Sequence, residues 1–131
     1  MTETSEVDLH RLGLEAWAVR DAARLIGATS VGCAVLDDLG RVFVGCNIEH
    51  RFRSHDIHAE INAISSLVAG GGSYLRAVFI AAERQRFTPC GGCLDWIFEI
   101  GDEITHVFTQ STVDGAIVSH TAGELMPYYP R

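Results

Sequence analysis

The sequence predicts an α/β fold, in which helices cover a β-sheet within one domain that spans residues 1–131. Short apolar runs typical of buried strands alternate along the chain with longer segments of helical periodicity. The chain has 131 residues, and 47% of them are hydrophobic, which is enough for one compact core. No repeat, low-complexity tract or linker interrupts the pattern, so a second domain is not expected.

The first half of the chain predicts a helix, a β-hairpin and a second helix. Apolar residues recur at three- and four-residue steps in the first segment, as an amphipathic helix requires. Two apolar runs then flank the turn sequence Asp37-Asp38-Leu39-Gly40, and three glycines follow the second helix. The expected elements are a helix from Leu9 to Ile26, strands at 30–36 and 42–46, a loop at 47–57 and a helix from His58 to Ala69.

The second half predicts further strands and helices in alternation. A buried strand comes first, with Val78-Phe79-Ile80 at its centre. The next helix is expected to begin at Pro89 with Thr88 as its N-cap, because proline suits the first helical position. The expected elements are a strand from Leu75 to Ala82, a helix from Pro89 to Ile100, a strand from Thr105 to Thr109, an apolar segment from Ala116 to Val118 and a short helix from Thr121 to Met126.

Composition excludes several kinds of partner. Ten basic and 17 acidic residues give a net charge of −7, which argues against a nucleic-acid backbone and favours a small molecule. No apolar stretch is long enough to span a membrane and no signal peptide is visible, so we expect a cytoplasmic protein. In that compartment cysteines are expected to be ligands or core residues, and Cys33 and Cys46, inside predicted strands, are expected in the core.

Two short motifs carry the chemistry, namely His58-Ala59-Glu60 and Pro89-Cys90-Gly91-Gly92-Cys93. Together they match a zinc-deaminase signature, in which one imidazole and two thiolates hold a zinc ion. Structural zinc sites normally have four protein ligands, whereas catalytic sites leave one position open. Three ligands, His58, Cys90 and Cys93, therefore predict a bound water and a reaction.

The spacing within each motif has a physical reason. Cys90 and Cys93 are three residues apart, so a helix that starts at Pro89 places both sulfurs on one face of its first turn. The positive end of that helix is expected to lower the thiol pKa values and favour the metal-binding thiolates. Glu60 is two residues from His58, which suits a proton carrier beside the metal better than a second ligand.

Further segments resemble the cytidine deaminase family, which includes the blasticidin-S deaminases. Gly45-Cys46-Asn47-Ile48-Glu49 resembles the family's Gly-x-Asn-Val-Glu segment, and Glu49 stands nine positions before His58, which is the family's spacing. The resemblance also includes Asp38 to Phe43 and Glu124-Leu125-Met126-Pro127, so it covers nearly the whole chain. It implies a three-layer α/β/α fold with a mixed sheet of about five strands.

The resemblance also implies roles for individual residues. His58, Cys90 and Cys93 would bind one zinc ion per subunit, and Glu60 would shuttle protons. Asn47 and Glu49 would hydrogen-bond the sugar of a nucleoside, and Ala59 would contact the substrate. The implied reaction is attack of hydroxide on C4 of a cytosine ring, followed by loss of ammonia. A small family member is also expected to be a homotetramer, with a dimer as the alternative.

Several positions differ from the family pattern. Small members carry cysteine at His58 and arginine at Ile61 and Leu94. Zinc with two thiolates and a neutral imidazole has no net charge, so apolar neighbours become tolerable. The family's aromatic stretch before the first strand has no counterpart at 24–29. The loop residues His50, Arg51, Arg53 and His55 are unusually basic, which suggests an anionic or carboxylated substituent on the substrate.

Three classes of function follow. The first is a deaminase of cytidine or deoxycytidine. The second is a deaminase of a different substrate, either a nucleoside antibiotic such as blasticidin S or a free amino-nucleobase such as guanine. The third is a zinc-stabilised binding domain, in which Glu60 has no catalytic part.

Overall fold

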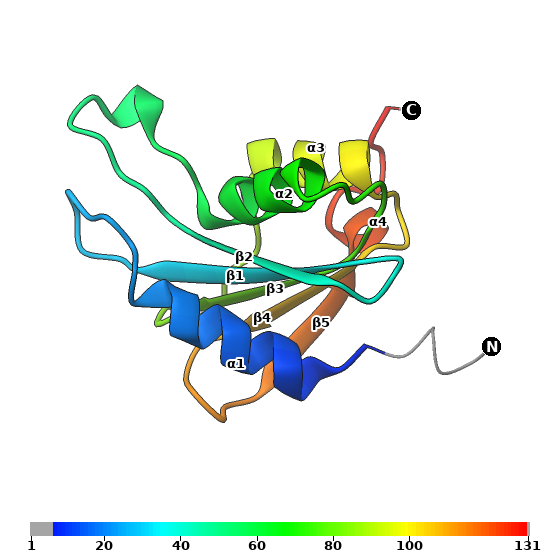
Figure 1. Cartoon of the computed structure of the whole chain (residues 1–131), viewed down its shortest axis with the longest axis horizontal. Coiled ribbons are helices and arrows are strands. Elements are labelled where there is room, and N and C mark those ends of the chain that lie inside the picture. Colours follow the sequence, from blue (N-terminus) through cyan, green and yellow to red (C-terminus); the bar gives the residue numbers. More distant parts are fainter. Residues whose placement is uncertain (1–6, 131) are drawn as a thin grey trace.

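The computed structural model describes residues 7–130 and confirms the predicted α/β fold, with a five-stranded mixed sheet between two layers of helices (Figure 1). No helix in this part of the chain is long and apolar enough to cross a membrane. The elements are α1 (Leu9–Arg20), β1 (Val31–Asp37), β2 (Val42–Cys46), the 3-10 turn η2 (Arg53–His55), α2 (Ala59–Ala69), β3 (Leu75–Ala82), α3 (Gly91–Ile100), β4 (His106–Gln110), β5 (Ile117–Thr121) and α4 (Ala122–Leu125).

The strands lie in the order β2-β1-β3-β4-β5. β1 pairs in antiparallel fashion with both β2 and β3, β3 pairs in parallel with β4, and β4 pairs in antiparallel fashion with β5. A parallel pair requires a crossover connection, which α3 provides. Helix α1 covers one face of the sheet, and α2, α3 and α4 lie on the other (Figure 1).

The central strands β1 and β3 are buried on both faces. In β1, Cys33 and Val35 pack in the cluster under α2 and α3, whereas Ala34 and Leu36 pack in the cluster under α1. Since successive residues of a strand point to opposite faces, a strand covered on both sides has a continuous apolar sequence. The prediction that Cys33 and Cys46 are core residues is confirmed, because both side chains are buried.

Two glycines allow the helices to approach the sheet closely. A Cβ atom at Gly32 would lie 1.9 Å from the carbonyl oxygen of Ala16 in α1. A Cβ atom at Gly45 would lie 2.3 Å from the backbone nitrogen of Ala63 in α2. Only glycine fits at such distances, so Gly45 fixes the position of α2 against β2 and, with it, the start of α2, where the first motif lies.

The predicted length of the first helix is wrong, because α1 ends at Arg20 rather than Ile26. The backbone of Arg24 instead pairs with the chain beyond β2: its N–H donates to Asn47 O, and its carbonyl accepts from Glu49 N–H. Ile26 is consequently 52% exposed. A long-range backbone pairing overrides the local helical periodicity of this segment.

Two further predictions need correction. The N-cap of α3 is Cys90 rather than Thr88, and the helix begins at Gly91 rather than Pro89. Residues before a proline disfavour helical backbone angles, and Thr88 lies outside the helix. The carbonyl of Cys90 accepts the first helical hydrogen bond, from Leu94 N–H. The apolar segment expected from Ala116 to Val118 corresponds to the start of the edge strand β5, which begins at Ile117 and continues through polar residues to Thr121.

Asp37, at the end of β1, is a fully buried carboxylate that organises the β1–β2 turn. Its Oδ1 accepts from the backbone N–H groups of Leu39 and Arg41, and its Oδ2 lies 2.7 Å from Nε of Arg41. Burial alone would raise the pKa of Asp37, but the hydrogen bonds from Arg41 and Leu39 outweigh burial and lower the pKa below its ordinary value. The ionised carboxylate therefore stabilises the folded state.

Replacing Asp37 with asparagine is expected to lower the free energy of unfolding by about 1–3 kcal/mol at pH 7, because buried donors lose a charged acceptor. The folded-state pKa is lowered, so the stabilisation is present above the unfolded pKa of about 4 and is lost as the pH falls through the folded-state pKa. Urea unfolding from pH 7 to pH 3 measures both effects. Asp38→Asn, at the exposed neighbour, is the control and should change stability by less than about 0.5 kcal/mol. Equal losses in the two variants would contradict the assignment.

Candidate metal centre and substrate pocket

Two helix starts bring the motif residues together. His58 is the N-cap of α2 and Cys90 is the N-cap of α3, and both have extended backbone angles. Neither side chain makes the capping hydrogen bond that serine, threonine or aspartate makes at this position. The two side chains are therefore free to serve as ligands, and Cys93 joins them from the first turn of α3.

The geometry of the three side chains fits a zinc ion. Their ligand atoms all lie within 4.8 Å of one another. Nδ1 of His58 is 3.3 Å from Sγ of Cys93 and 3.5 Å from Sγ of Cys90. Zinc bonds of about 2.0–2.1 Å to nitrogen and about 2.3 Å to sulfur, at tetrahedral angles, would separate the nitrogen from each sulfur by about 3.6 Å. The observed separations are close to this value, so only small shifts would be needed to hold the ion.

The surroundings of the cluster match its expected charge. Leu94 is 5% exposed and Ile61 is half-buried, so apolar side chains occupy the two positions where the family has arginine. The expectation of a lowered thiol pKa is wrong for Cys93: burial, followed by the negative charges of Glu60 and Cys90, raises its pKa. A bound cation would supply the charge that favours the Cys93 thiolate.

Glu60 is the second residue of α2 and lies directly beside the candidate ligands. Its side chain is buried and lines the same pocket as His58 and Cys90. Burial raises the pKa of Glu60, and the charges of His58 and Arg84 offset part of that rise. A carboxyl group with a raised pKa is suited to carry a proton at neutral pH.

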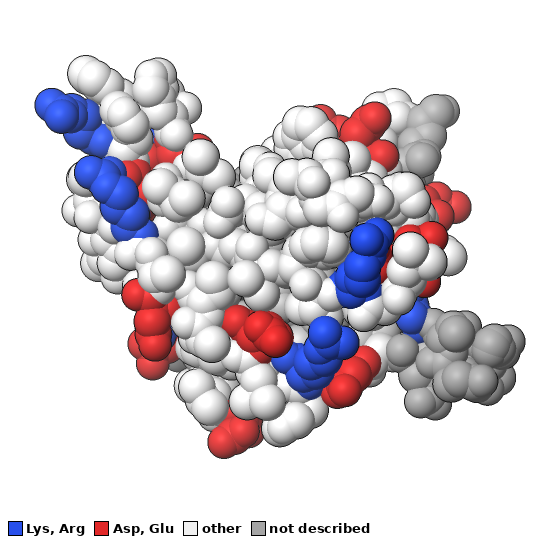
Figure 2. All heavy atoms as spheres, viewed as in Figure 1, with Lys and Arg blue, Asp and Glu red and all other residues white. Residues whose placement is uncertain are grey.

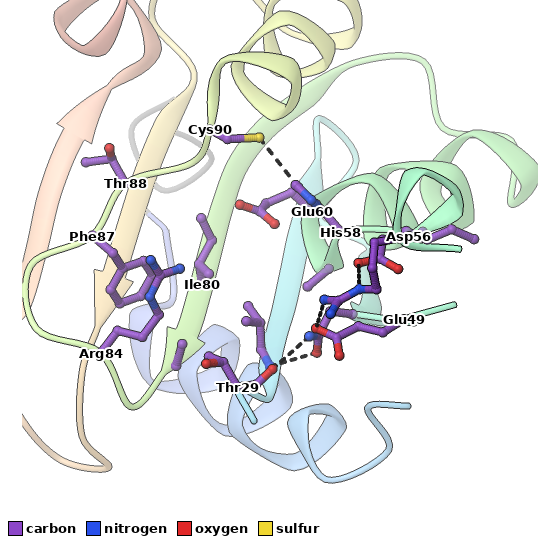
Figure 3. Close-up of a pocket in the computed structure, with 16 residues that line it drawn as sticks. Thr29, Glu49, Asp56, His58, Glu60, Ile80, Arg84, Phe87, Thr88 and Cys90 are labelled. Atoms are coloured by element: carbon purple, nitrogen blue, oxygen red, sulfur yellow. Dashed lines mark hydrogen bonds and ion pairs between the residues drawn. The ribbon is translucent and has the colours of Figure 1, made fainter. Parts of the chain in front are cut away.

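A cavity of 300 Å³ opens in front of this cluster (Figure 3). In Figure 3, Cys90, His58 and Glu60 lie at one end, Arg84 and Phe87 form one wall, and Glu49 and Asp56 lie on the opposite wall. Its lining residues are Thr29, Val31, Asn47, Glu49, Arg53, Asp56, Ile57, His58, Ala59, Glu60, Ile80, Ala82, Arg84, Phe87, Thr88 and Cys90.

Asn47 and Glu49 line the pocket, as expected from the sequence, but both side chains also tie loops together. Asn47 Oδ1 accepts from Val31 N–H, and its Nδ2 donates to the carbonyl oxygen of Thr29. Glu49 Oε1 accepts from the N–H groups of residues 26 and 27. These two backbone hydrogen bonds, helped by the charge of Arg53, lower the pKa of Glu49.

Arg53 of the basic loop already has carboxylate partners within the protein, so it is not available to bind an anionic substrate group. Arg53 Nη2 lies 3.0 Å from Glu49 Oε2, and Arg53 Nε lies 2.9 Å from Asp56 Oδ2. Two carboxylates therefore neutralise this guanidinium. The rings of His50 and His55 contact each other, with centroids 5.0 Å apart, and neither residue lines the pocket.

The sequence interpretation missed the wall formed by Arg84 and Phe87. Both residues lie in the connection between the end of β3 and Cys90. The carboxyl ends of strands in an open α/β sheet are the usual place for a ligand, so the position of this connection was the signal available. Thr29, Val31 and Ile80 were missed as well.

The starts of two helices in a three-layer fold bring together an imidazole, two thiols and a buried carboxyl group. This combination defines the class of zinc-dependent deaminases. Residues 8–110 match the cytidine and deoxycytidylate deaminase zinc-binding region. This match spans more than half of the chain, so the protein belongs to the cytidine and deoxycytidylate deaminase family. It is a zinc-dependent enzyme of the hydrolytic deaminase type.

Individual relatives agree with this assignment. A cytidine deaminase from Sporosarcina psychrophila is 28% identical over 123 residues, which cover 92% of this chain and 90% of that protein. A probable cytidine deaminase from Dictyostelium discoideum is 34% identical over 74 residues, which cover 55% of this chain and 50% of that protein. The crystal structure of cytidine deaminase from Burkholderia pseudomallei superposes with a TM-score of 0.83 at 28% identity, and the match covers 93% of this chain and 98% of that chain.

Proposed function

We propose that the protein deaminates a cytosine nucleoside, namely cytidine, deoxycytidine or a modified analogue, to its uracil form with release of ammonia. The observation that carries this proposal is the buried carboxyl group of Glu60 beside three convergent candidate ligands at one end of the cavity. The cavity volume of 300 Å³ is typical of a compact small-molecule site and suits a nucleoside.

Each group has a distinct part in the proposed reaction. His58, Cys90 and Cys93 would hold the zinc ion, which lowers the pKa of water to about 7 when bound. Glu60 would accept a proton from the attacking water and donate it to the leaving amine, as C4 of the ring exchanges nitrogen for oxygen. Ala59, which is buried between His58 and Glu60, would contact the cytosine ring.

Asn47 and Glu49 would bind the sugar through the N–H group and the lone pair that their contacts with the loops do not use. An amide nitrogen has two N–H groups and each oxygen has two lone pairs. One N–H of Asn47 and one lone pair of Glu49 Oε2 remain after the contacts with Thr29 and Arg53. The same contacts hold both side chains rigidly, so little conformational entropy would be lost on binding.

An ammonia-release assay of the zinc-loaded protein tests the proposed substrate. We expect turnover of cytidine and deoxycytidine and none of guanine, because the proposed site recognises a sugar as well as a base. Turnover of guanine alone would replace the proposal with a nucleobase deaminase, and turnover of blasticidin S alone would replace it with an antibiotic deaminase. Absence of ammonia from every compound would favour the zinc-stabilised binding domain.

We further propose that the enzyme is a homo-oligomer, with a tetramer preferred to a dimer, that acts on nucleosides in cytoplasmic pyrimidine salvage. A reducing compartment suits the chemistry, because all four cysteines are free thiols and two of them are candidate ligands. Light scattering should give the mass of four 14.3 kDa chains. A monomeric mass would contradict the proposed assembly.

A further inference from the structure

Asn62 of α2 connects two parts of the chain that form the pocket. It lies four residues after His58 and two after Glu60, and its side chain is half-buried. Its Oδ1 accepts a hydrogen bond of 3.0 Å from the backbone N–H of Cys46, the last residue of β2. Asn47, which is proposed to bind the sugar, follows Cys46 directly. One hydrogen bond therefore joins the sugar side of the pocket to the helix at the metal end.

The backbone N–H of Cys46 points away from the sheet and needs an acceptor elsewhere. β2 is an edge strand that pairs with β1. The next N–H along the chain, that of Asn47, points toward β1 and donates to Val31 O. Since successive N–H groups of a strand point in opposite directions, the N–H of Cys46 points to the free edge. Cys46 is buried, so the Asn62 side chain satisfies a donor whose loss of a partner would be costly.

Helix α2 and strand β2 approach each other closely beside this hydrogen bond. A Cβ atom at Gly45 would lie 2.8 Å from Cβ of Asn62, so no further side chain fits between the two elements. The backbone N–H of Asn62 also donates to the carbonyl oxygen of His58, at 3.0 Å, which places the two residues in one helical turn. A displacement of Asn62 relative to β2 would therefore displace the metal end of the pocket relative to its sugar side.

A second connection lies at the base of the loop between β2 and α2. Ile48 and Ile57 exchange backbone hydrogen bonds of 2.8 and 2.9 Å as an antiparallel bridge. The loop between them projects from the molecule, and Figure 2 shows a hollow between this projection, at the upper left, and the helix layer. The bridge fixes the base of the loop at one point and the Asn62 contact fixes α2 at another. Together they set the orientation of α2 against Asn47.

We propose that Asn62 is a positioning residue, which holds Asn47 and Glu49 in the correct place relative to the metal end of the pocket. This inference rests on the proposed deaminase function and adds to it a residue outside the pocket lining. A nucleoside has to contact the sugar-binding residues and the reacting end at the same time. A misplacement of about 1 Å can lower a rate about 100-fold, so the hydrogen bond between Asn62 and Cys46 is expected to affect catalysis without touching the substrate.

The test compares the wild type with Asn62→Leu, Asn62→Asp and Ser66→Ala. Leucine has a similar branched shape but no acceptor, whereas aspartate keeps an oxygen that can accept from the N–H of Cys46. Ser66 is the matched control, because it is a half-buried residue of α2 outside the pocket lining. Its Oγ donates to the carbonyl oxygen of Asn62 at 3.2 Å, so Ser66→Ala removes a different hydrogen bond of the same helix.

Two readouts are taken on the zinc-loaded proteins. The first is kcat/KM for cytidine. The second is the dissociation constant of 1-methyluracil divided by that of uridine, from NMR titrations, which reports the contribution of the sugar because both ligands carry the same base. Asn62→Leu should lower kcat/KM about 10- to 100-fold and the binding ratio about 10-fold. Asn62→Asp and Ser66→Ala should stay within about threefold of the wild type in both.

A purely structural role for Asn62 predicts a different result. Asn62→Leu would then bind uridine and 1-methyluracil more weakly by the same factor, and the unchanged ratio would overturn the proposal. Asn62→Asp as impaired as Asn62→Leu would also overturn it, because the acceptor is kept. If Asn62→Leu does not fold, Asn62→Ala takes its place, since alanine lacks the acceptor and favours the helix.

The two readouts separate this inference from the proposed function. If cytidine is not deaminated but uridine binds more tightly than 1-methyluracil in an Asn62-dependent way, the proposed function fails and the positioning role stands. If cytidine is deaminated and the binding ratio does not depend on Asn62, the positioning role fails alone. If cytidine is not deaminated and uridine does not bind, both fail.

Discussion

Replacing Glu60 with glutamine is expected to lower kcat for deamination by about 10²- to 10⁴-fold, the range that a positioned proton carrier contributes. Glutamine fills nearly the same volume in the buried position but cannot accept a proton from water. Because Glu60 is not one of the three convergent ligands, zinc should remain bound at one ion per chain. The measurement is single-turnover deamination together with the metal content of the same sample.

The control for this variant is Glu99→Gln, at an exposed position of α3 away from the pocket, which should retain full activity. Loss of turnover in Glu60→Gln with zinc retained separates an enzyme from a zinc-stabilised binding domain. Retention of more than about a tenth of the wild-type kcat would contradict the proton-carrier role. Loss of both zinc and turnover would instead make Glu60 part of the metal site.

Replacing Cys93 with alanine is expected to weaken zinc binding more than 100-fold, because removal of a direct ligand costs more than the roughly 10- to 100-fold loss measured for outer-shell partners. Cys93 is fully buried at the first turn of α3, so solvent does not readily replace its sulfur. Zinc that binds the folded state stabilises it by an amount that increases with the affinity. The rise in melting temperature that zinc causes in the wild type should therefore be absent from Cys93→Ala. Metal analysis after dialysis and thermal melts with and without zinc measure the two effects.

Cys46→Ala is the matched control, since Cys46 is also a buried thiol but lies in β2 outside the ligand cluster. It should lose some stability through the smaller side chain and keep its zinc. Equal zinc loss in the two variants would indicate a general loss of folding rather than the loss of a ligand. Zinc retained by Cys93→Ala would remove Cys93 from the ligand set.

The parts of the fold that depend on local pattern could be predicted from the sequence. The bounds of β2 and β3 agree with the predicted strands, because apolar side chains of both strands pack against the helix layers on the two faces of the sheet and give each strand an apolar run. The end of α1 could not be predicted in this way. It depends on backbone pairing between Arg24 and the chain beyond β2, a contact 23 or more residues away that leaves no local signal.

For the candidate site too, the sequence predicted the residues of the motifs but not the contacts of the other side chains. The motif spacing predicted which side chains meet, and His58, Cys90 and Cys93 do converge. The spacing did not indicate that Glu49 and Asp56 neutralise Arg53, or that Arg84 lies over the ring of Phe87 on the pocket wall. The partner that each arginine meets depends on side-chain positions in three dimensions, and the composition of a loop does not supply them.

The central claim is that one imidazole and two thiolates hold a single zinc ion beside Glu60. Zinc K-edge X-ray absorption of the purified protein tests it directly, because the method reports the number and type of ligand atoms around the ion. The account predicts one zinc per chain with two sulfur ligands at about 2.3 Å and lighter ligands at about 2.0 Å. A spectrum with four sulfurs, or with none, would contradict it.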